Sequence, residues 1–168
     1  MDRLTNIEEE FKNVLLEIDT ATTLASGYRY LNKVTVVNLE DEGLILDEGD
    51  FPAINIYLDP DEKIINGDQQ SYRSIVKFKL VCKVAVDQLE VNPRFAINTK
   101  MNTLLSDLKA VLSYKYQLNC TCDRADIKRS MRLYNADTNN NLRVGQLVLE
   151  VDVLYSQSRL NPLLNACV

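Results

Sequence analysis

The chain has 168 residues, of which 46% are hydrophobic, and its formal net charge is −5. This length and composition suit one domain with a real core, so a disordered tail and a miniprotein that depends on covalent staples are excluded. The negative net charge argues against a protein that binds nucleic-acid phosphates, because such binders usually carry an excess of basic residues. We expect a single domain over residues 1–168, with its core at about 4–156 and a C-terminal extension at 157–168.

The N-terminal segment, Met1 to Glu8, is polar and lacks the apolar stretch of a secretory signal. No segment approaches the ~20 continuous apolar residues of a membrane helix. We therefore expect a protein that is made in a cytoplasm, has no membrane contact and keeps its thiols reduced. The four cysteines are Cys82, Cys120, Cys122 and Cys167.

Residues 5–18 are predicted to form an amphipathic helix. Thr5 and Glu8 have the spacing of a capping box, in which each side chain accepts a hydrogen bond from the other residue's backbone amide. Residues 8–10 are all glutamate and would fall in the first turn, where negative charge suits the helix dipole. Apolar residues then recur at helical spacing and predict one buried stripe. These are Ile7, Phe11, Val14, Leu15 and Ile18.

Two strands are expected after this helix, at residues 28–39 and 51–58, which are rich in β-forming residues. Pro52 lies near the start of the second strand, where a missing N–H donor is tolerated. The segments 40–50 and 59–71 are polar and are predicted to be loops.

Residues 74–87 predict a long strand whose two faces differ in chemistry. Side chains alternate between the faces of a sheet, so one row is core and the other is a basic stripe. The core row is Val76, Phe78, Leu80, Cys82, Val84 and Val86. The basic stripe consists of Lys77, Lys79 and Lys83, with Val81 among them.

A second helix is predicted at residues 93–112, with Asn92 as its cap and Pro93 at its first position. Its apolar stripe is Ile97, Met101, Leu104, Leu105, Leu108, Val111 and Leu112. The polar residues Lys100, Asp107 and Lys109 are expected on the opposite side.

Two further strands are predicted at residues 127–134 and 143–156, joined by the polar turn 135–141. The last strand has an apolar row at Leu147, Leu149, Val151, Val153 and Tyr155. Its other row contains Gln146, Glu150 and Asp152. Strands and helices do not alternate regularly, which predicts an α+β fold with a mostly antiparallel sheet flanked by two main amphipathic helices.

No residue pattern indicates catalysis, and we expect no catalytic, cofactor-binding or metal-binding residues. The chain has no histidine, which removes the commonest general base and most zinc sites. Cys120 and Cys122 are separated by one residue, unlike zinc knuckles and redox pairs. The acidic segments 47–50 and 59–62 lack the spacing of a calcium loop and are better explained as solvated loops.

The charged rows have two interpretations, and one is a solvated sheet face, which antiparallel sheets often have. The other is that Lys77, Lys79 and Lys83 pair with carboxylates, either Glu150 and Asp152 on a neighbouring strand or their counterparts in another subunit. Such pairs are worth ~0.2–1 kcal/mol each, so they would set register and partner choice more than stability. Apolar residues on the same faces favour a buried subunit contact. They are Val81, Val148 and Leu154.

Taken in order, these segments resemble the tail terminator, or tail completion, proteins of long-tailed bacteriophages. The likeness spans about Leu4 to Tyr155 and is architectural, since that family has no diagnostic catalytic or metal motif. The segments are helix 5–18, Phe51-Pro52-Ala53-Ile54-Asn55-Ile56-Tyr57, strand 74–87, helix 93–112 and Val151-Asp152-Val153-Leu154-Tyr155. The polar loops 40–50, 59–71 and 135–142 and the tail after Tyr155 depart from the family's pattern.

The resemblance implies a structural virion protein that assembles in the host cytoplasm into a ring, usually a hexamer. Its partners would be the tail tube protein and a head-connector or head-completion protein, and DNA would pass through the ring without specific binding. Three alternatives remain open: another neck, baseplate or tube component of the phage, a cellular protein-interaction module, and an enzyme that works without histidine.

Overall fold

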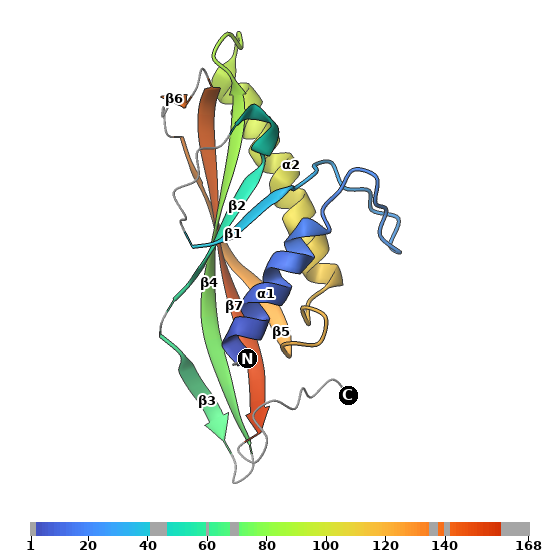
Figure 1. Cartoon of the computed structure of the whole chain (residues 1–168), viewed down its shortest axis with the longest axis vertical. Coiled ribbons are helices and arrows are strands. Elements are labelled where there is room, and N and C mark those ends of the chain that lie inside the picture. Colours follow the sequence, from blue (N-terminus) through green and yellow to red (C-terminus); the bar gives the residue numbers. More distant parts are fainter. Residues whose placement is uncertain are drawn as a thin grey trace.

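A computed structural model describes residues 3–40, 47–59, 61–67, 71–134, 138–139 and 142–158 (Figure 1). The two helices are α1 (Arg3–Leu16) and α2 (Pro93–Tyr114), and a short 3-10 helix, η1, spans Glu48–Asp50. The strands are β1 (Val36–Leu39), β2 (Ala53–Leu58), β3 (Lys63–Gly67), β4 (Ser71–Asp87), β5 (Arg124–Leu133), β6 (Thr138–Asn139) and β7 (Leu142–Ser158). The predicted α+β fold with a mostly antiparallel sheet is confirmed.

The sheet is organised around the pairing of β4 with β7. The strand order is β1-β2-β4-β7-β5, with β3 beside β4 and β6 beside β7. Only β1 and β2 pair in parallel among the described strands. The 17 residues of β4 pair with the 17 residues of β7 along their full length, from Ser71 opposite Ser158 to Asp87 opposite Leu142. These two strands run along the long axis of the molecule (Figure 1).

Both helices pack against the same face of this sheet (Figure 1). The predicted apolar rows of β4 and β7 are buried there together with the stripes of α1 and α2, so these predictions are confirmed. The opposite face carries Lys77 and Glu150 and has no helix over it among the described elements. We call it the uncovered face.

The predicted capping box on α1 is wrong. The helix begins at Arg3, so Thr5 lies inside it, and no acidic residue falls in its first turn. Arg3 is 6% exposed, and its guanidinium carbon lies 5.6 Å from the centroid of the Tyr155 ring. This contact with β7 holds the helix start in place, so a tertiary interaction outweighs the local capping signal. The helix ends at Leu16, two residues before the predicted end, although Ile18 is buried.

Two of the predicted boundaries are wrong in the first half of the chain. Only Val36–Leu39 of the expected strand 28–39 is a strand, because residues 28–32 are held in a loop by a side chain of α2. Residues 63–67, expected to be a loop, form β3, which pairs with the first part of β4. The turn predicted at 135–141 contains β6, while residues 135–137 and 140–141 lie outside the described part of the chain, as do residues 159–168 of the extension.

The side chain that holds the 28–32 loop is Asp107, which was expected to face solvent but is completely buried. Its carboxylate accepts hydrogen bonds from the Tyr28 hydroxyl at 2.8 Å, from the Leu31 and Asn32 backbone amides at 3.0 and 2.8 Å, and from Asn32 Nδ2 at 2.7 Å. Burial and the hydrogen bond from its hydroxyl to Asp107 raise the pKa of Tyr28 to about 12. Helical periodicity missed Asp107 because its partners lie far away in the sequence.

The predicted start of α2 is confirmed. The Asn92 side chain accepts a hydrogen bond from the Phe95 amide at 3.4 Å, and Pro93 occupies the first turn. This helix lies so close to β7 that a Cβ added to Gly145 would come within 2.3 Å of Ile97 Cγ2. A glycine at this strand position therefore sets how closely α2 approaches the sheet.

We expect Asp107→Asn to lower the free energy of unfolding by about 1–3 kcal/mol, because an amide places donors against the loop amides that the carboxylate accepts from. Urea unfolding followed by circular dichroism measures this change. Glu9→Gln, which removes one charge at an exposed position of α1, serves as the control. An Asp107→Asn protein as stable as the control would contradict the role of this carboxylate.

We expect Gly145→Ala to destabilise the protein by about 1–3 kcal/mol through overpacking against Ile97. Gly49→Ala is the matched control, because a Cβ there meets no atom within 4 Å. Thermal unfolding of both variants provides the comparison. Equal melting temperatures would show that α2 moves away from β7 without cost.

Candidate functional site

The predicted charged rows meet on the uncovered face. Lys77 lies directly opposite Asp152, and Lys79 lies opposite Glu150, in the ladder of β4 and β7. Lys83 lies opposite Gln146, so it has no carboxylate facing it across this ladder. The structure therefore brings four of the five predicted residues together and places Lys83 further along the strand.

These opposed charges do not form ion pairs within the described part of the chain. Its ion pairs within 4.0 Å involve Asp19, Glu17 and Asp126 as the acidic partners, and none involves Glu150 or Asp152. Lys77, Lys79 and Glu150 are exposed, and Asp152 is half-buried. Their charges consequently remain available for groups outside the described part of the chain.

The neighbouring strand β5 adds charges that the sequence interpretation missed. Arg129 lies opposite Glu150, and Asp126 lies opposite Asp152. Asp126 is held by Arg124 at 2.7 Å and by Lys128 at 3.5 Å, which offsets its repulsion with Asp152. A register shift between Ile127 and Arg129 breaks the alternation of β5, so residue spacing alone gave no signal for this arrangement.

The charged face, as we call Lys77, Lys79, Lys128, Arg129, Asp126, Glu150 and Asp152, surrounds a shallow hollow of about 340 Å³. This hollow is lined by Asp59, Lys77, Phe78, Lys79, Lys128, Glu150 and Asp152. Small-molecule sites are usually about 300–1,000 Å³ and mostly apolar. A small hollow lined by charges of both signs is better suited to the surface of another macromolecule.

An apolar row crosses the sheet next to the charged face. Val81, Val148 and Met131 lie opposite one another on β4, β7 and β5. Val148 is 4% exposed, whereas Met131 is 37% exposed. Apolar contacts bordered by charges of mixed sign are typical of protein–protein interfaces. The uncovered face thus has the composition of a contact surface.

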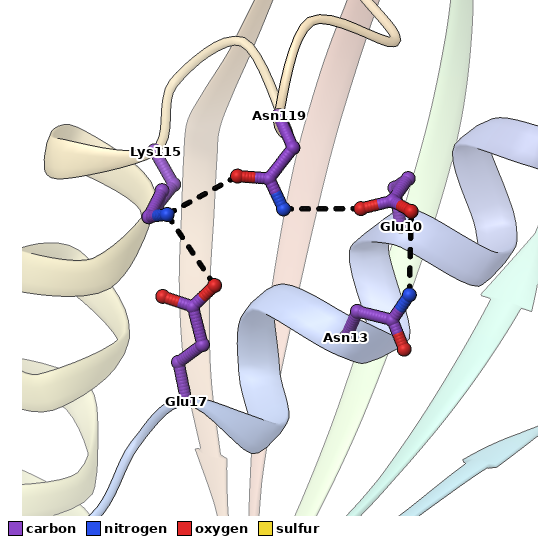
Figure 2. Close-up of polar contacts among 5 residues, drawn as sticks. All are labelled: Glu10, Asn13, Glu17, Lys115 and Asn119. Atoms are coloured by element: carbon purple, nitrogen blue, oxygen red, sulfur yellow. Dashed lines mark hydrogen bonds and ion pairs between the residues drawn. The ribbon is translucent and has the colours of Figure 1, made fainter.

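A second polar cluster joins α1 to the segment after α2 and has a different character (Figure 2). Lys115 Nζ lies 3.4 Å from Glu17 Oε1 and donates to Asn119 Oδ1 at 3.1 Å. Asn119 Nδ2 donates to Glu10 Oε2 at 3.0 Å, and Asn13 Nδ2 donates to Glu10 Oε1 at 3.3 Å. These polar groups satisfy one another within the subunit, so the cluster stabilises the packing of the two helices rather than offering a binding site.

Two of the cysteines, Cys82 and Cys122, have little nucleophilic character in this fold. Burial raises the pKa of the Cys82 thiol above its usual range and raises the pKa of Cys122 to about 12. The thiolate is the reactive form, so both side chains behave as small apolar groups. Cys120 is disulfide-bonded, so the expectation that all thiols are reduced is wrong for this residue. Cys167 lies outside the described residues.

Two other kinds of site come into question among the described residues, a metal site and a membrane-spanning helix. No group of three or more histidine, cysteine, aspartate or glutamate residues there is arranged to hold a metal ion. None of the helices in that part of the chain is both long enough and apolar enough to cross a membrane.

We expect Cys82 and Cys122 to resist iodoacetamide in the folded protein at pH 8 and to react fully in urea, because their raised pKa values and burial suppress the thiolate. Peptide mass spectrometry assigns the alkylated residues. Rapid alkylation of Cys122 in the folded protein would show that its thiol is accessible and reactive.

The charged face is thus the strongest candidate site, and it has the features of a binding surface. Neither a scan against models of known protein families nor a search of curated proteins found a match to this chain.

Proposed function

We propose that this chain is a structural virion protein of the tail terminator kind. It assembles into a ring, usually hexameric in the family that the sequence resembles, at the head-proximal end of a phage tail tube. There it stops polymerisation of the tube and joins the tail to the head connector. The observation that carries the proposal is the uncovered charged face, on which Lys77, Lys79, Glu150 and Asp152 form no ion pairs within the described part of the subunit.

The charged face supports assembly because it contains both signs of charge in a defined register. Lys77 and Lys79 lie along one strand, and Glu150 and Asp152 lie along its neighbour. A partner with the complementary arrangement fits in one register only, and like charges reject a shifted one. Each pair contributes ~0.2–1 kcal/mol, so the apolar row beside the face supplies the remaining attraction.

Ring formation also follows from interface geometry. A contact between two different surfaces of the same subunit generates a closed ring when the rotation between copies closes, and an open filament when it does not. Termination then requires that the ring present tube-compatible contacts on one side only. The net charge of −5 suits a protein that surrounds DNA without adhering to it.

The double variant Lys77→Glu/Lys79→Glu tests the proposal. It places four carboxylates opposite one another on β4 and β7, so rings should weaken while the subunit still folds. Loss of both pairs and the new repulsion should raise the apparent dissociation constant at least about tenfold. Native mass spectrometry across a concentration series gives the oligomer distribution.

Lys12→Glu/Lys33→Glu is the control, because it makes the same change in net charge outside the charged face and also removes the exposed Lys33–Asp19 ion pair. Unchanged rings in the Lys77→Glu/Lys79→Glu protein would assign the row to a solvated sheet face. A wild-type protein that stays monomeric at high concentration would contradict the ring itself. Electron microscopy separates a terminator from a tube component, since the first forms discrete rings and the second forms open-ended tubes.

A further inference from the structure

The connection between β4 and α2 lies at one end of the molecule (Figure 1). Three large apolar side chains of this connection and of the first turn of α2 are exposed. Leu89 is 89% exposed, Val91 is 98% exposed and Phe95 is 69% exposed. We call these three residues the apolar tip. Single exposed apolar residues are ordinary, but a cluster of this kind marks a contact site.

The apolar tip is held in place by local hydrogen bonds. The Leu89 amide donates to Asp87 Oδ1 at 2.7 Å, and the Glu90 amide donates to the Asp87 carbonyl at 3.2 Å. The Asn92 cap fixes the backbone of Phe95 at the start of α2. A preorganised tip loses little conformational freedom on binding, which favours association.

A second hollow lies between the C-terminal half of α2 and the start of β5. It has a volume of about 360 Å³ and is lined by Lys109, Leu112, Ser113, Tyr116, Arg124, Ala125, Asp126 and Ile127. We call it the α2 hollow. Leu112, Ala125 and Ile127 give it apolar walls, unlike the hollow of the charged face.

The tip and the hollow have complementary charges. Asp87 and Glu90 flank the tip and are exposed. Lys109 and Arg124 line the hollow and supply more positive charge than Asp126 offsets. Arg94 is the cation nearest the tip along the chain. Its guanidinium carbon lies 5.1 Å from the centroid of the Tyr134 ring.

The tip of one chain cannot reach its own hollow. Phe95 and Leu112 are both in α2, and a rise of 1.5 Å per residue separates them by about 25 Å. Both are parts of one continuous helix, so no loop movement brings them together. Only another copy can place a tip in the hollow.

We propose that the apolar tip of one subunit docks in the α2 hollow of the next subunit. Two different surfaces meet in this contact, so it is the head-to-tail kind that builds a ring. The inference rests on the proposed function and names a contact that joins neighbouring copies. It lies between α2 and the edge of the sheet and borders the charged face, with which the hollow shares Asp126.

Two variants each remove one half of this contact. The tip variant is Leu89→Ser/Val91→Ser, and its matched control is Ile64→Ser/Ile65→Ser, where two exposed apolar residues of β3 lie outside the tip. The hollow variant is Ser113→Trp, which fills the hollow from an exposed position of α2. Its control is Ser106→Trp, also exposed on α2 but outside the hollow lining.

Sedimentation velocity of each variant alone, and of the two mixed, tests the contact. Each variant alone should be monomeric, with a circular dichroism spectrum and melting temperature like those of the wild type. The mixture should form a one-to-one heterodimer and no larger species, because one intact tip and one intact hollow remain. Both controls should form the same rings as the wild type.

Three results would overturn the inference alone. Wild-type rings from both variants would show that neighbouring copies are joined elsewhere, and the proposed function would stand. Rings that persist in the tip variant but no longer bind tail tubes would assign the tip to the tube. Monomeric variants whose mixture also stays monomeric would exclude a tip-and-hollow contact. A monomeric wild type, by contrast, would overturn the proposed function together with this contact.

Discussion

The full-length pairing of β4 with β7 is the constraint on which the rest of this structure depends. Because strand side chains alternate, a single register determines which residues lie on each face of the sheet. It buries Phe78 and Leu149 under the helices and leaves Lys79 opposite Glu150 on the other side. A shift of one residue would place the lysines in the core, where an unpaired charge is very costly. The core and the charged face are thus two consequences of the same ladder.

The two helices complete the core on one face only, and this asymmetry creates the candidate interface. α2 is fixed by close contact with Gly145 and by the Asp107 carboxylate, which orders the loop leading into β1. Lys115 and its polar neighbours connect α1 to the end of α2. The polar groups of these contacts are satisfied within the subunit. On the charged face, Lys77, Lys79, Glu150 and Asp152 have no ion pair within the described part of the chain, and this difference distinguishes a surface built for stability from one available to a partner.

Association of this subunit would combine weak charge pairs with apolar contacts. Exposed pairs contribute little free energy but determine register and partner choice. Val81 and Met131 of the apolar row, together with the apolar tip, would supply buried area in two separate places. A subunit that recognises copies of itself and its neighbours in this way needs no reactive centre.

The sequence by itself determined the α+β class, both helices, the inner rows of β4 and β7, and the alternation that separates lysines from core residues. These features depend on local periodicity and on the Asn92 cap, so they are visible in a single chain. Only the tertiary structure decided that Glu150 lies opposite Lys79, that Asp107 is buried, and that α1 begins at Arg3. Register, long-range hydrogen bonds and the bulge in β5 depend on partners distant in the sequence, and no local pattern encodes them.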